Sequence, residues 1–100
     1  MATLHHNITG DLNQELIAPG NNITVSKVSI TNISASNTVN VSLYIEKKLL
    51  GKFHLLSKVQ IPPYTTLLYD DAIKFDNGPD QFGLYIGLTG TSPMVDVIIN

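Results

Sequence analysis

An apolar residue stands at every second position between residues 38 and 46. Successive side chains of a β-strand point to opposite faces, so this alternation predicts a strand with one apolar and one polar face. β-Branched and aromatic residues dominate the segment, and such residues pack well on a half-buried sheet surface. The strand therefore needs neighbouring strands and a second layer over its apolar face. The residues of that face are Val39, Val41, Leu43 and Ile45.

The segment 23–33 carries two apolar pairs that are out of phase with each other. One extra residue at positions 26–27, a β-bulge, brings both pairs to the same face of a single strand. We therefore predict a strand over 23–33 with a bulge at 26–27. The short connection 34–37 predicts a hairpin that pairs this strand antiparallel with the strand at 38–46. The four apolar residues are Ile23, Val25, Val28 and Ile30.

Short apolar segments and turn residues alternate through the second half of the chain. Between residues 53 and 61 we predict a strand, a break at 57–58 and a second short strand. Pro62 and Pro63 cannot donate backbone hydrogen bonds to a central ladder, so this point lies at an edge or in a loop. Further strands are predicted over 65–69, 72–75, 82–88 and 94–100, with turns at 19–22, 47–52, 76–80 and 90–93.

The pattern predicts an all-β protein, because no segment of ten residues has helical periodicity and turns recur at near-regular spacing. The expected fold is a single antiparallel β-sandwich, jelly-roll or immunoglobulin-like, with about eight short strands. One hundred residues make one domain. Residues 15–100 are expected to form the sandwich. Residues 1–14 have weak periodicity and predict an extended N-terminal arm or an edge strand.

Composition and charge narrow the function classes. The net charge is −2 and the six basic residues form no dense patch, which argues against nucleic acid as a partner. The chain has no cysteine, which excludes disulfides and thiolate metal sites. No apolar run approaches the roughly 20 residues that span a bilayer, so we expect no membrane partner. The N-terminus lacks the basic and apolar regions of a signal peptide, which indicates synthesis in a cytoplasm.

Histidines and aspartates are the candidates for chemistry. His5 and His6 are adjacent, and on a strand they point to opposite faces, which is poor geometry for binding a metal. Asp70 and Asp71 are adjacent, with Asp76 and Asp80 nearby, and such carboxylates can act as acid and base or bind Ca²⁺. Their spacing does not match an EF-hand, so turn formation is the favoured interpretation and a loop Ca²⁺ site the alternative.

A hydrolase has little support. His54 has no cysteine partner in the chain and no serine in a nucleophile-elbow context. We therefore predict no catalytic, cofactor-binding or metal residues, no cofactor, and a protein that is not an enzyme. Four N-glycosylation motifs begin at Asn7, Asn22, Asn32 and Asn40; without a signal peptide they are interpreted as a by-product of strands rich in Asn, Ser and Thr.

Apolar residues at turns and in the arm predict protein–protein contacts. Leu49 and Leu50 stand at a turn tip, where apolar residues are unusual. Only 14% of the residues are charged, against roughly 25% in typical soluble domains, so the surface is easily desolvated. The arm lacks a core of its own and is expected to add a strand to a neighbour, so that deleting residues 2–12 leaves the core folded. The candidate interface residues are Leu4, His5, Ile8, Leu49, Leu50, Pro62, Pro63 and Tyr64.

Several motifs resemble one family. The second half contains FHLLSKVQIPPYTTLLYDD, AIKF, DNGPD and MVDVIIN in this order, and the first half contains VSKVSITNISASNTVNVSLYIEK. Over residues 23–99 this arrangement resembles the small β-sandwich structural proteins of tailed bacteriophage virions. The family has Gly after the proline where this chain has Pro63 and Tyr64. The resemblance implies a non-enzymatic virion protein, in capsid decoration, head–tail connection or the tail. Implied partners are other virion subunits, such as capsid, connector or tail proteins, and further copies of the chain in a homo-oligomer.

The alternative function is a carbohydrate-binding or adhesin-like β-sandwich. Sugar binding usually needs an exposed aromatic platform. The chain has no tryptophan, and its four tyrosines are spread along the sequence. We therefore rank carbohydrate binding second to the virion role. The tyrosines are Tyr44, Tyr64, Tyr69 and Tyr85.

Overall fold

The computed structural model describes residues 4–21, 25–47, 50–70, 73, 75 and 77–100. These residues form eight β-strands and no helix, which confirms the predicted all-β class with about eight short strands. No helix that could cross a membrane is found among them. The strands are β1 (Leu4–Thr9), β2 (Asn13–Ile17), β3 (Val28–Asn32), β4 (Val39–Lys47), β5 (Gly51–Ile61), β6 (Thr66–Tyr69), β7 (Gly83–Gly90) and β8 (Met94–Ile99).

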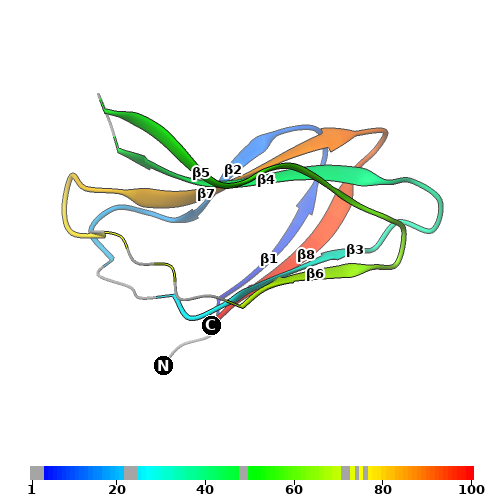
Figure 1. Cartoon of the computed structure of the whole chain (residues 1–100), viewed down its shortest axis with the longest axis horizontal. Helices are drawn as coiled ribbons and strands as arrows, with labels where there is room; N and C mark the ends of the chain where they lie inside the picture. Colours follow the sequence, from blue (N-terminus) through cyan, green and yellow to red (C-terminus); the bar gives the residue numbers. More distant parts are fainter. Residues whose placement is uncertain (1–3, 22–24, 48–49, 71–72, 74, 76) are drawn as a thin grey trace.

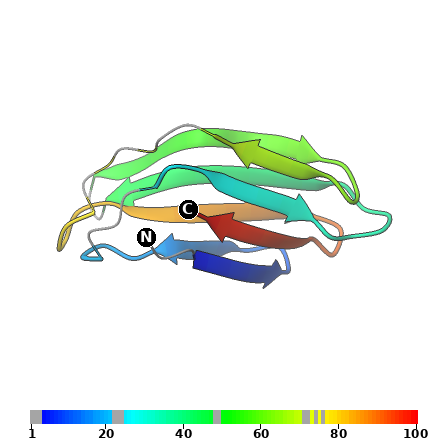
Figure 2. The same cartoon turned by 90° about the horizontal axis from the view of Figure 1, so that it is seen from below.

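The strands form two stacked antiparallel sheets (Figures 1 and 2). The first sheet has the order β1-β8-β3-β6 and the second the order β2-β7-β4-β5. Each of the connections β1–β2, β3–β4, β5–β6 and β7–β8 joins strands at corresponding positions of the two sheets. This arrangement is the eight-stranded jelly roll, so the structure selects the jelly roll over the immunoglobulin-like alternative.

The core lies between the sheets, and on β3, β4, β7 and β8 it is built mainly from every second residue. On β4 the predicted apolar face is confirmed: Val39, Val41 and Leu43 are buried, and Ile45 packs against the core. The apolar phases of β7 and β8 are buried in the same way. These strands therefore each contribute one side to a common core. The buried residues of β7 and β8 in this cluster are Leu84, Ile86, Leu88, Val95, Val97 and Ile99.

The predicted bulge before β3 is confirmed. The backbone N–H groups of Ser26 and Lys27 both donate to the carbonyl oxygen of Asn100, at 2.6 and 3.2 Å, so two residues oppose one. Val25 and Val28, on either side of the bulge, are both buried. The regular strand is shorter than the predicted 23–33 and begins at Val28; Ile23 lies outside the described residues.

The predicted hairpin between β3 and β4 is wrong, because the connection crosses from the first sheet to the second. The fully buried Asn32 organises this corner. Its Nδ2 donates to the carbonyl oxygens of Asn37 at 2.8 Å and Ile61 at 2.9 Å, and its Oδ1 accepts from the N–H of Ser34 at 3.0 Å. The side chain supplies partners that a hairpin ladder would otherwise provide, so the chain can leave its sheet.

The predicted break at 57–58 is also wrong, because β5 is continuous over Gly51–Ile61. Its pairing with β4 shifts register on both sides of Leu43. Lys58 has a φ of 51°, and its N–H donates to Ser42 Oγ at 3.0 Å. These irregularities change the phase of the apolar residues along the strand, which made one strand look like two.

Residues 1–14 do not form a separate arm where the structure describes them. β1 is an edge strand paired with β8 of its own sheet, and Ile8 is only 2% exposed, in the core. β2 begins at Asn13, so the expected boundary at residue 14 falls inside a strand of the sandwich. Deleting residues 2–12 would remove the pairing of β1 with β8 and the buried Ile8, so from the structure we expect the deletion to destabilise the core.

Candidate functional site

The candidate interface residues on β1 have different environments. His5 is exposed, Leu4 packs partly against the core, and Ile8 is buried. Ile8 was expected on the docking surface, and its 2% exposure corrects this, because the side chain faces the second sheet. The strand therefore offers only His5 and part of Leu4 to a neighbour from the predicted set.

The β4–β5 hairpin exposes apolar side chains, as expected for Leu50. Leu50 is 59% exposed at the turn; Leu49 lies outside the described residues. Phe53 on β5 is 50% exposed, and its ring meets Phe82 edge-on at 6.0 Å between centroids. Lys47 Nζ lies 6.0 Å from the centroid of Phe82. Sequence reasoning assigned Phe53 only to a strand, although it shares the apolar character of the neighbouring turn.

The loop at Pro62, Pro63 and Tyr64 exposes the Tyr64 side chain to 74%. This loop follows the last residue of β5, whereas Leu50 precedes the first. An 11-residue strand at about 3.3 Å per residue places the two roughly 30 Å apart. The predicted residues therefore do not form one surface, since they lie at an edge, at a hairpin tip and at the opposite end of the sandwich.

The outer face of the first sheet carries two exposed apolar residues that were missed. Leu68 of β6 and Ile98 of β8 are 54% and 44% exposed. Ser29 of β3 is the cross-strand partner of both, so the three side chains lie in one row. The sequence signal that could have identified them is an apolar residue at a position of each strand that faces outward, where a polar residue is expected.

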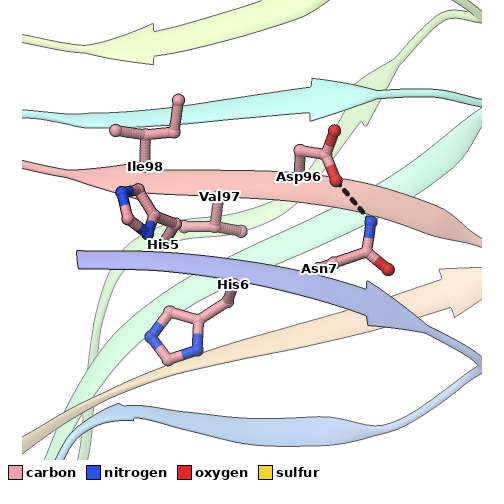
Figure 3. Close-up of a pocket in the computed structure, with 6 residues that line it drawn as sticks. All are labelled: His5, His6, Asn7, Asp96, Val97 and Ile98. Carbon is pink, nitrogen blue, oxygen red and sulfur yellow. Dashed lines mark hydrogen bonds between the residues drawn. The ribbon is translucent and has the colours of Figure 1, made fainter.

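A shallow depression of about 420 Å³ lies over β1 and β8 (Figure 3). The imidazole rings of His5 and His6 stand on opposite sides of β1, as the alternation predicted, so they do not converge on a common ligand. At the polar end of the depression, Asn7 Nδ2 donates to Asp96 Oδ1 at 2.5 Å, so these two side chains are hydrogen-bonded to each other. Within the described ranges no three potential metal ligands gather. The lining residues are His5, His6, Asn7, Asp96, Val97 and Ile98.

Two of the four tyrosines come together on the outer face of the second sheet. Tyr44 stacks on Tyr85 at 5.6 Å between centroids with 10° between the planes, and His54 tilts against Tyr44 at 5.2 Å. Lys52 Nζ lies 4.9 Å from the centroid of Tyr44. Tyr44 is only 3% exposed in consequence. The tyrosines were described as spread along the sequence, and cross-strand pairing brings this pair together.

The Tyr85 hydroxyl of this row has a raised pKa. Burial raises the pKa of Tyr85 above its ordinary value, and the nearby Glu15 raises it further. The Tyr85 hydroxyl donates to Glu15 Oε2 at 3.1 Å, and this bond favours the protonated phenol. The side chains of this row contact one another through their rings and through a hydrogen bond, which is typical of a row that stabilises the sheet.

The acidic candidates are only partly described. Asp70 and Asp80 are exposed, and Asp80 has a φ of 59°, typical of a turn. Asp71 and Asp76 lie outside the described residues. Asp70 and Asp80 thus fit the favoured interpretation of turn-forming acids, and the Ca²⁺ alternative stays a prediction.

The comparisons with known proteins show the fold. No protein-family model matches the chain, and no curated protein matches it. A crystal structure of PirA is similar with a TM-score of 0.57 at 14% identity, over 96% of this chain and 92% of that chain. The Anabaena sensory rhodopsin transducer gives a TM-score of 0.45 at 15% identity, over 93% of this chain and 92% of that chain. At 14% identity the likeness to PirA shows the fold alone.

Proposed function

We propose that the chain is a non-enzymatic structural subunit of a tailed-bacteriophage virion, in the capsid decoration, the head–tail connection or the tail. It acts by docking on other subunits. The observation that carries the proposal is the exposure of large apolar side chains on the outer face, the hairpin and the loops. Six such side chains are between 37% and 74% exposed: Leu12, Leu50, Phe53, Tyr64, Leu68 and Ile98.

Exposed apolar groups and few charges favour a covered surface. Exposed apolar side chains that lie in one row, as Leu68 and Ile98 do on either side of Ser29, are typical of interaction sites, and charged residues are depleted at the centres of interfaces. With 14% charged residues, this chain loses little charge solvation when a neighbour covers it. The motif resemblance supports a phage particle as the setting. The jelly roll itself occurs in viral capsid proteins and in lectins, so the fold favours neither over the other.

Carbohydrate binding is the second candidate, because the Tyr44–Tyr85 pair is the kind of feature a lectin uses. A sugar stacks on an open ring face. Here one face of the Tyr44 ring is taken by Tyr85, while His54 and Lys52 approach it as well. With 3% exposure Tyr44 offers no open face. The geometry thus supports docking better than sugar binding.

Asn32 supports synthesis in a cytoplasm without N-glycosylation. It begins one of the N-glycosylation motifs, yet its Nδ2 is fully buried and donates to two carbonyl oxygens. A glycan on this nitrogen would remove a donor hydrogen and would have no space in the core. A folding route that glycosylates the motif would therefore prevent the fold, whereas a bacterial host cytoplasm leaves the amide free.

Mass spectrometry of purified particles tests the proposal. Particles of the phage that encodes the chain are banded on a gradient, and the chain is quantified against the major capsid protein and against the soluble lysate. We expect the chain to band with particles at a fixed ratio to a capsid or tail protein. Its confinement to the soluble fraction would refute the virion role. A glycan array on the purified protein tests the second candidate in parallel.

A further inference from the structure

Four loops gather at one end of the sandwich, which we call the loop end: residues 10–12, 33–38, 62–65 and 91–93 (right-hand side of Figure 1). Backbone hydrogen bonds at their bases tie them into one rim. Gly10 N–H donates to the carbonyl oxygen of Pro93 at 2.9 Å, and Asn32 N–H to that of Thr65 at 2.9 Å. The pairing of β1 with β8 places Leu4 and Ile99 at the other end, so neither the start of β1 nor the end of β8 obstructs this rim.

The loop end carries almost no charge. Asp11 is the one acidic residue in the four loops, which contain no glutamate and no lysine, arginine or histidine. Tyrosine is enriched at interfaces, whereas lysine, glutamate and aspartate are depleted there. Hydroxyl groups make adaptable hydrogen bonds without the desolvation cost of a charge. The hydroxyl residues are Ser34, Ser36, Thr38, Tyr64, Thr65, Thr91 and Ser92.

Tyr64 projects from the β5–β6 loop, which joins the edge strands of the two sheets and so lies at one edge of this rim, at the opposite edge from Asp11. It is 74% exposed, the largest value among the exposed large apolar residues, and it adopts a φ of 56°. That conformation is strained for a bulky residue, whereas glycine adopts it freely. The chain therefore keeps an aromatic side chain in solvent at a position where glycine would relieve strain.

The backbone around Tyr64 is held in place. Pro62 and Pro63 each have a fixed φ, and Thr65 Oγ1 donates to the carbonyl oxygen of Pro63 at 3.2 Å. The Thr65 carbonyl in turn accepts from Asn32 in the buried corner. Restricting the loop before binding reduces the entropy lost on association. The backbone thus presets the point and direction at which the Tyr64 side chain leaves the loop, which favours its use as an interface anchor.

We infer that the loop end docks on an uncharged protein surface of the virion, with Tyr64 inserted into an apolar pocket of that surface. This inference rests on the proposed function and specifies which part of the chain contacts the other virion protein. Nucleic acids are bound mainly through lysine and arginine contacts to their phosphates, as are anionic lipid surfaces, and the four loops contain neither residue. An exposed aromatic side chain beside a hydroxyl-rich rim with one acidic residue and no cation matches a protein partner, because a few buried residues, often Trp, Tyr or Arg, carry most of the affinity of protein interfaces.

A binding experiment with particles assembled without the chain tests the contact. The full-length labelled protein is titrated against these particles, with Tyr64→Gly, Tyr64→Phe and the control Leu50→Ser at the opposite end. We expect Tyr64→Gly to weaken binding at least tenfold. Tyr64→Phe should stay within about threefold and Leu50→Ser should match the wild type. A melting curve checks the fold of Tyr64→Gly, which should be as stable as the wild type because the strain is relieved.

Each contrary result has a separate meaning. Wild-type binding that Tyr64→Gly leaves unchanged would overturn the inference and leave the proposed function standing, above all if Leu50→Ser lost binding instead. Wild type that neither binds these particles nor bands with complete virions would refute the proposed function and the inference together. Glycan binding that is present in the wild type and lost in Tyr64→Gly would overturn the proposal that the partner is a protein.

Discussion

Asn32→Ala should be among the most destabilising polar substitutions in the chain. Asn32 is fully buried and makes three hydrogen bonds, two from Nδ2 to carbonyl oxygens and one to Oδ1 from a backbone N–H. Alanine removes all three and leaves the carbonyl oxygen of Ile61 and the N–H of Ser34 without this partner in the buried part of the corner. Each buried polar group left unpaired costs about 1–3 kcal/mol. Two of the three bonds are buried, so we expect a total loss of about 3–5 kcal/mol.

This loss is a large part of the stability of a small domain, which is about 5–15 kcal/mol. The assay is urea unfolding at equilibrium, followed by far-UV circular dichroism, with Asn40→Ala as the matched control. Asn40 is half-buried on the other side of β4 from the core, so its replacement should cost less than about 1 kcal/mol. If the two variants lost equal free energy, the corner would not depend on the Asn32 side chain, and our reason for the crossing between sheets would be wrong.

Three further predictions concern stability. Leu43→Ala should cost about 2–5 kcal/mol in a thermal or urea melt, because the side chain is fully buried; a loss below 1 kcal/mol would contradict its place in the core. Gly83→Ala should destabilise more than Gly87→Ala, since a Cβ at Gly83 would lie 2.8 Å from the backbone oxygen of Ile17, whereas at Gly87 it meets a movable side-chain end; equal melting temperatures would contradict this. Burial and Glu15 raise the pKa of Tyr85 in the folded protein, so the protonated hydroxyl contributes its full stabilisation below pH 10.0, and this stabilisation is lost as the pH rises through the raised pKa. Melts of the wild type and of Tyr85→Phe at about pH 9 to 11.5 check this, because the variant should lack this part of the alkaline loss of stability.

The strands were predictable where one apolar phase persists. Val39, Val41 and Leu43 on β4, and the matching phases of β7 and β8, became core as expected. The bulge before Val28 was predictable too, because a two-sided burial of that segment would have placed Ser and Thr in the core. These elements follow from local alternation, which is a property of the sequence itself.

The elements that were missed depend on contacts far apart in the chain. The crossing at Asn32 relies on a bond to Ile61, 29 residues later, and a short connection by itself favours a hairpin. The stacking of Tyr44 on Tyr85 likewise needs the register between β4 and β7. The sequence already predicted that Tyr64 lies in a loop, on the basis of the two preceding prolines. Its separation from Leu50 follows only from the length and continuity of β5.

A density map of the phage particle by cryo-electron microscopy tests the central claim most directly. We predict that copies of this jelly roll occupy defined positions on the capsid, the head–tail connection or the tail. In each copy the loop end should face a neighbouring protein, with the Tyr64 side chain in an apolar pocket and the ends of β1 and β8 directed away. A map of particles that carry the chain's gene and expressed product, yet show no density for this fold, would contradict the claim.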